Sequence, residues 1–172
     1  VTERLQDYHR TFKNVMGFLK LQIYGGAKIK SITIQGNNNE VLSGTATISV
    51  AYGEAPVITM TGDGNTVKLN CNNVTTGEKK ADATAFWIAL PPTNFEQGFA
   101  ITVEDDYENE TTMNSDPIEI RRNIIKPMAA FKVEKQAPPI PELPTVNSTL
   151  PVLYIYTPNN TPVVDKVNWI AE

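Results

Sequence analysis

The feature that most constrains this chain is an alternation of apolar and polar side chains with a period of two. Leucine and isoleucine alternate with polar residues over positions 19–23, and isoleucine does so again over 32–35, after the pair Gly25-Gly26. Because successive side chains of a β-strand point to opposite faces, each segment predicts a strand with one apolar face. Together with the glycines, the segments predict a β-hairpin whose apolar face must be covered by another sheet or a helix.

Further strands are predicted along the rest of the chain, and no segment shows a helical period. A strand over 45–50 is expected to be half-buried, and Gly62 to Asn65 are expected to form the turn of a hairpin. The predicted segments are 45–50, 56–60, 66–71, 86–90, 99–103 and a last strand that begins at Ile118. About eight strands at short intervals are typical of an all-β fold, and we expect a sandwich of two antiparallel sheets.

The composition limits the classes of protein and partner. A chain of 172 residues is long enough for one main hydrophobic core, and 41% hydrophobic with 20% charged residues is ordinary for a globular protein. The formal net charge of -4 provides no basic surface for nucleic acid or for anionic lipid. No signal peptide or membrane span is seen, but Val1 is not a natural start, so we expect an upstream segment to have been removed.

The domain organisation follows from a change of composition near Lys135. Residues 1–135 are predicted to form the sandwich, and residues 136–151 carry five of the twelve prolines. Such a segment favours an extended linker, although a strap lying back on the sandwich is the alternative. Residues 152–172 resemble a β-hairpin, which either pairs with the sandwich or starts a second domain.

The chain lacks the residue sets on which most catalytic and metal sites depend. It has one histidine, His9, and one cysteine, Cys71. Catalytic sets of the Ser/His/Asp and Cys/His kinds would both need His9, and one cysteine with one histidine cannot form a structural zinc site, so neither kind of site is expected. His9 lies among charged residues and is interpreted as a solvated surface histidine. Cys71 lies on the apolar side of its strand and is interpreted as an inert core thiol. We therefore predict no enzyme activity and no cofactor.

Two features leave alternatives open. The loop over residues 104–110 carries several carboxylates, which suit either a hard cation such as Ca²⁺ or a solvated hairpin tip. Trp87 lies between Phe86 and Ile88 in the strand, so its side chain points to the side opposite theirs. There it either faces solvent and stacks on a sugar or covers the second face of the sandwich. Arg121 and Arg122 are both expected to point outward.

Five segments between Phe12 and Phe131 resemble one known family. They are FKNVMGFLKLQI, IKSITIQGNNNEVLSGTATI, NTVKLNC, FWIALPPTNFEQGFAITVED and IEIRRNIIKPMAAF. The set is similar to the fimbrillin-like domains of surface lipoproteins from Gram-negative anaerobes. This resemblance implies a transthyretin-like or immunoglobulin-like sandwich that is exported to the cell surface, held at the outer membrane by a lipid anchor outside this chain, and used in adhesion or fimbria assembly. It also implies partner subunits that exchange strands, and a missing first part of the domain that leaves a sheet edge open.

The tail suggests a second family. Residues 150–172 are similar to the opening of spore-coat-protein-H-type, kinase-like domains, which implies that the sandwich is a spacer for a downstream domain. Three hypotheses follow: a non-enzymatic cell-surface interaction module, a carbohydrate-binding domain for host or dietary glycan, and such a spacer. The aromatic residues that motivate the second hypothesis are Trp87, Tyr107, Tyr154 and Tyr156.

Overall fold

Twelve β-strands and one short 3-10 turn make up residues 12–136, the part of the chain that the computed structural model describes. The elements are β1 (Gly17–Tyr24), β2 (Lys28–Gly36), β3 (Ala46–Ser49), β4 (Val57–Met60), β5 (Thr66–Thr75), η1 (Lys80–Asp82), β6 (Thr84–Leu90), β7 (Thr93–Phe95), β8 (Phe99–Asp105), β9 (Glu110–Asn114), β10 (Ile118–Ile120), β11 (Ile125–Pro127) and β12 (Phe131–Lys132). This part contains no helix with the length and hydrophobicity of a membrane span.

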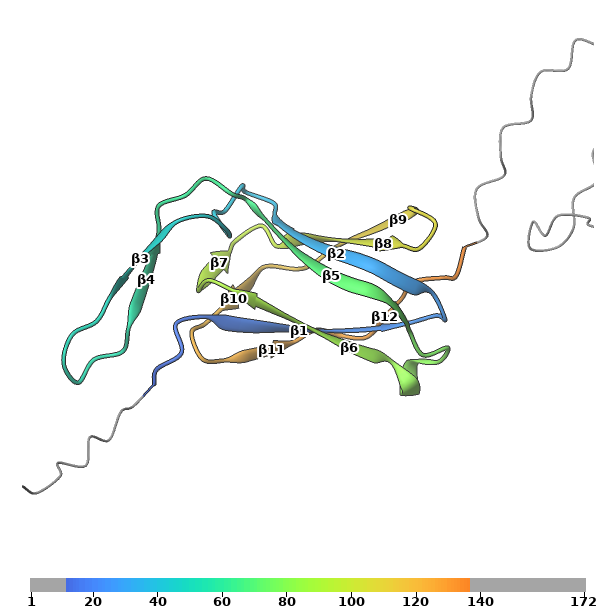
Figure 1. Ribbon diagram of the computed structural model, residues 1–172, viewed down its shortest axis with the longest axis horizontal. Coiled ribbons are helices and arrows are strands. Elements are labelled where there is room, and N and C mark those ends of the chain that lie inside the picture. The colour runs from blue at the N-terminus through green and yellow to red at the C-terminus, as the bar shows by residue number, and fades with distance from the viewer. Residues whose placement is uncertain (1–11, 137–172) are drawn as a thin grey trace, which may run out of the picture.

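Two main sheets face each other (Figure 1). In the first, β1 is central: β6 pairs with it antiparallel, and β11 and β12 pair one after the other along its opposite edge, both parallel to it. The second sheet has the antiparallel order β5-β2-β8-β9. A small pair of β7 and β10 and a separate hairpin of β3 and β4 complete the fold. The fold is therefore an all-β sandwich, as the alternation predicts.

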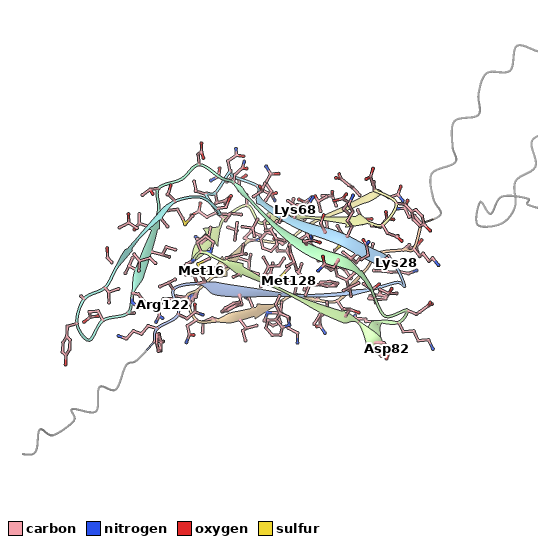
Figure 2. The ribbon with its side chains drawn as sticks, viewed as in Figure 1. Met16, Lys28, Lys68, Asp82, Arg122 and Met128 are labelled. Carbon is pink, nitrogen blue, oxygen red and sulfur yellow. The ribbon has the colours of Figure 1, made fainter. Side chains whose placement is uncertain are left out.

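The core lies between the inner faces of the two sheets (Figure 2). Along β1 every second side chain is buried, and β8 repeats this pattern. Fully buried leucine and isoleucine side chains each contribute about 1.5–3 kcal/mol of transfer free energy. The largest fully buried side chains of the core are Phe95, Phe99, Leu19, Leu21, Ile23, Ile29, Ile32, Ile34, Leu90, Ile101 and Ile120.

The hairpin predicted for residues 19–35 is wrong. β1 and β2 are consecutive in the chain but lie in different sheets, and neither pairs with the other. Gly25 makes the crossing possible: its φ is +123°, and a Cβ there would overlap the carbonyl oxygen of Val133. The alternation identifies which side of each strand is buried, but two strands that face one core from opposite sheets show the same alternation as two strands in one sheet.

The hairpin turn predicted at Gly62 to Asn65 is also wrong. β4 pairs with β3, with Ile48 opposite Ile58, whereas β5 pairs with β2. Residues 62–65 instead cross from the hairpin to the second sheet, where Gly64 forms a bridge with Ser43. All four residues of β3 are exposed, so the strand expected to be half-buried is not covered.

The last predicted strand is divided into three. β10, β11 and β12 lie where a single strand from Ile118 was expected, separated by irregular segments. β9 was not predicted, because its sequence, ETTMN, has no apolar alternation; it lies at the edge of the second sheet and pairs only with β8. Residues 137–172, which include most of the proline-rich linker and the hairpin-like tail, lie outside the described residues.

Candidate functional site

The hairpin of β3 and β4, here called the arm (residues 46–60), projects beyond the two sheets (Figure 1). Its pairing register places apolar residues opposite each other, Ala46 with Met60 and Ile48 with Ile58, on the same side of the ribbon. Threonine and serine occupy much of the other side. On the apolar side Ile48 is 52% exposed and the adjoining Val50 is 70% exposed. The arm is thus amphipathic, and its apolar side is only partly covered.

An apolar cleft lies between the arm and the segment that leads into β1. Its volume is about 530 Å³, and its walls are mostly aliphatic or aromatic. They include Phe12, Val15, Ile48, Val50, Tyr52 and Pro56. Because Tyr52 and Phe12 are almost fully exposed, the rim of this cleft presents aromatic as well as aliphatic surface to solvent.

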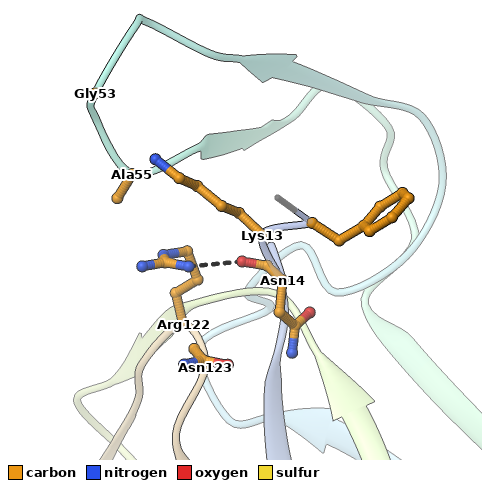
Figure 3. Close-up of a pocket in the computed structure, with 7 residues that line it drawn as sticks. Lys13, Asn14, Gly53, Ala55, Arg122 and Asn123 are labelled. Atoms are coloured by element: carbon orange, nitrogen blue, oxygen red, sulfur yellow. Dashed lines mark hydrogen bonds between the residues drawn. The ribbon is translucent and has the colours of Figure 1, made fainter. Parts of the chain in front are cut away.

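A second cleft of about 380 Å³ adjoins the apolar one and is polar (Figure 3). The two share Phe12, Lys13 and Gly53 in their walls. The second cleft adds Asn14, Ala55, Arg122 and Asn123, and it contains two cationic side chains. We call it the cationic cleft.

Three segments position the cations of this cleft. Arg122 Nη1 donates a hydrogen bond to the backbone oxygen of Asn14 at 2.7 Å, and Lys13 Nζ donates to the backbone oxygen of Glu54 in the arm. Asn123 has a φ of +60°, and its N–H donates to Met16 O at 2.8 Å, which fixes the turn that carries Arg122. Arg122 is partly buried where it lines this cleft, whereas Arg121 is exposed and paired with Glu119.

The charged side chains that line the cationic cleft are both cationic, although the chain as a whole is acidic. Within residues 12–136 no carboxylate lies within ion-pairing distance of Lys13 or Arg122. Some of the other charged groups in this part are paired, for example Lys132 with Glu134 at 2.7 Å, whereas others, such as Lys79 and Glu110, form no ion pair within the same residues. Both arginines were expected to point outward, and no local pattern shows that Arg122 meets the N-terminal segment, so this cleft was missed.

A second polar cluster lies on the outer face of the β5-β2-β8-β9 sheet. A β-bulge between Ile29 and Ser31 allows Ile29 and Ile32 to be buried together and places Ser31 beside Glu104. The Glu104 carboxylate accepts hydrogen bonds from Lys30 at 2.7 Å, Ser31 at 2.7 Å and Lys68 at 3.2 Å. These donors, Lys30 foremost, lower the pKa of Glu104 to about 2.

The acidic loop over residues 104–110 connects β8 to β9 as a hairpin tip. Asp105 is buried, and its carboxylate accepts the backbone N–H groups of Tyr107 and Asn109 and the Asn109 side-chain amide, at 2.8 to 3.0 Å. Asp106 pairs with Lys28, and Glu108 with Lys30. In the part of the chain that the structure describes, no group of three or more acidic, histidine or cysteine side chains is placed to hold a metal ion.

Trp87 projects from the outer face of β6 and is 48% exposed. Its neighbour across the strand pair is Lys20, whose Nζ lies 5.2 Å from the centre of the indole ring in a cation-π contact. The Trp87 side chain faces outward with Lys20 over the ring, and stacking on a sugar stays a prediction. Tyr107 belongs to a loop of the other sheet, while His9, Tyr154 and Tyr156 lie outside the described residues.

Cys71 is buried in the core cluster, as the sequence predicts, with 6% of its surface exposed. Burial raises the pKa of its thiol to about 11, so the reactive thiolate is scarce at neutral pH. This agrees with a packing role.

Comparison with family models, curated proteins and solved structures finds no match to this chain. The candidate functional features of the described residues are therefore the arm and the two clefts beside it.

Proposed function

We propose that this chain is a non-enzymatic interaction module of an exported cell-surface protein, used in adhesion or in fimbria-like assembly with other subunits. The observation that carries the proposal is the arm, because its apolar side is exposed while the side chains of the main core are closely covered. A two-stranded ribbon is marginally stable in water by itself, so a partner that covers it stabilises both the arm and the complex.

The exposed apolar residues of the arm form the kind of surface that protein interfaces bury. On the apolar side Ile48 and Val50 are each more than half exposed, and Tyr52 at the tip is fully exposed. Aromatic residues are enriched at interfaces, and burying apolar surface gains about 25 cal/mol per Å² before the costs of association. An arm that projects from a rigid sandwich can reach a neighbouring molecule without rearranging the core.

The edges of the sheets support the same function. Within residues 12–136, β5, β9 and β6 each have a paired neighbour on one side only. Unpaired strand edges accept an additional strand from another chain, which is the strand exchange that the fimbrillin-like resemblance implies. Export to the cell surface, a lipid anchor outside this chain and partner subunits of the same kind are parts of the proposal that depend on that resemblance.

The test compares the two sides of the arm. The double variant Ile48→Thr with Val50→Thr makes the apolar side polar, and Thr47→Ala with Ser49→Ala changes the other side as a matched control. Sedimentation equilibrium of the full chain is expected to show reversible self-association that the first variant weakens by about tenfold or more, and the control by much less. A wild-type chain that stays monomeric would contradict assembly from copies of this chain.

Carbohydrate binding is a second candidate, favoured by the half-exposed indole of Trp87. Aromatic rings stack on sugar faces, but here the Lys20 ammonium already occupies a position over the ring. A glycan array probed with the full chain and with Trp87→Ala tests it, because a glycan that stacks on the indole must lose affinity in the variant.

A further inference from the structure

We propose that the two adjoining clefts at the base of the arm together form a binding site for an extended acidic peptide of a partner protein. A glutamate or aspartate carboxylate of the peptide binds Lys13 and Arg122 in the cationic cleft, and an aliphatic side chain on the same side of the peptide enters the apolar cleft. This inference rests on the proposed interaction function and names the chemistry that the partner presents.

The cationic cleft matches a carboxylate in charge and in hydrogen bonding. Its charged lining consists of Lys13 and Arg122, and Glu54 contributes its backbone oxygen to the Lys13 ammonium. A guanidinium has five N–H donors, and only one hydrogen bond of Arg122 is made within the described residues. The remaining donors form a planar fork that fits the two oxygens of a carboxylate.

The cationic groups are held in place before a ligand arrives. The hydrogen bond from Arg122 to Asn14 joins the turn after β10 to the segment before β1, and Lys13 joins that same segment to the arm. Figure 3 shows the two side chains extending toward the turn that holds Gly53 and Ala55. Side chains that are ordered beforehand lose less entropy on binding, which raises affinity.

The apolar cleft determines which kind of anion fits. Its aliphatic walls at Ile48, Val50 and Pro56 offer no hydrogen bonds to the hydroxyl groups of an acidic sugar, whose burial there is costly. An extended peptide places every second side chain on the same side, about 6.8 Å apart. A peptide with an aliphatic residue two positions from a glutamate therefore presents both side chains on one side, and the two clefts that would receive them adjoin through their shared walls at Phe12, Lys13 and Gly53. These observations favour an acidic peptide over an acidic glycan.

The experiment uses a terminally blocked pentapeptide of sequence TITET and its neutral counterpart TITQT, titrated into the isotopically labelled full chain and followed by NMR. The acidic peptide is expected to shift the Arg122 guanidinium signal and the methyl signals of Ile48 and Val50, and to bind about tenfold or more tightly than the neutral peptide. Added salt is expected to weaken the binding of the acidic peptide but not that of the neutral peptide.

The decisive variants are two neighbouring arginines. Arg122→Gln is expected to lower affinity for the acidic peptide by about tenfold or more. Arg121→Gln removes the same charge from an exposed side chain outside the cleft and is expected to leave the affinity nearly unchanged. Lys13→Gln provides a second variant in the cleft, in case Arg122→Gln unfolds the chain, and Glu54→Gln, which keeps both cations, is expected to preserve binding.

The inference is overturned if the two peptides bind equally, if neither binds, or if the two arginine variants behave alike. Binding of an oligogalacturonate that depends on Arg122, with no binding of the acidic peptide, would assign the cleft to an acidic glycan and also overturn it. Arm-dependent self-association that persists when no peptide binds would show that the proposed function stands while this inference fails.

Discussion

At the scale of single residues, Glu104 links the fold to pH. The pKa of its carboxyl is lowered to about 2 because Lys30, Ser31 and Lys68 donate to it. In the unfolded chain an ordinary glutamate titrates near pH 4.3. A pKa that is lower in the folded state means that the carboxylate stabilises the fold fully above about pH 5, and that this stabilisation is lost as the pH falls toward about 2.

We therefore expect the melting temperature of the wild-type chain to fall more steeply between about pH 5 and about pH 2 than that of Glu104→Gln, which has no carboxylate to protonate at this position. Differential scanning calorimetry across this range measures the effect. Glu110→Gln, an exposed carboxylate on β9, serves as the control and is expected to follow the wild-type curve. Curves for wild type and Glu104→Gln that run parallel would contradict the prediction.

At the scale of elements, the arm differs from the strands of the sandwich. Its strands pair only with each other, and β3 has no buried residue. β1 and β2 are each paired on both sides and bury alternate side chains. Local opening costs little free energy where few apolar contacts are lost, so the arm is expected to open independently of the core.

Native-state hydrogen exchange tests this difference. The backbone N–H groups that pair β3 with β4, between Ala46 and Met60, are expected to exchange far faster than those of β1 and β2. Binding of a partner to the apolar side of the arm is expected to slow exchange there first. Protection in the arm equal to that of β1 in the isolated chain would show instead that the arm is stabilised to the same degree as the core.

At the scale of the whole molecule, both sheets depend on one core. Leu21 on β1 and Ile34 on β2 come from opposite sheets, and both are fully buried in the same cluster. Leu21→Ala and Ile34→Ala are each expected to lower the free energy of unfolding by about 2–5 kcal/mol, because each leaves a cavity that neighbours fill only in part.

Urea denaturation followed by circular dichroism measures these changes, and each variant is expected to show a single transition because neither sheet can keep its inner face covered alone. Gln35→Ala, on the exposed side of β2, is the control and is expected to change the stability by about 0.5 kcal/mol or less. Two separate transitions in either core variant would mean that the sheets unfold independently.

The candidate site was only partly predictable. The apolar residues of β3 were recognised as one side of a strand, and the outward side chain of Trp87 was one of the two alternatives. The cationic cleft was not predicted, because Lys13 and Arg122 are more than a hundred residues apart and only folding brings them to the same cleft. The expected half-burial of β3 failed for a similar reason, since alternation describes an apolar side but not whether anything covers it.

The sequence alone determined the all-β class, the buried sides of β1, β2 and β8, and the buried position of Cys71, because each depends on a period of two that is local to a strand. Tertiary structure alone decided that β1 and β2 lie in opposite sheets, that β4 pairs with β3, and that β11 and β12 run parallel to β1. Strand partners are chosen by long-range packing and by backbone geometry at positions such as Gly25, and a local alternation carries no information about either.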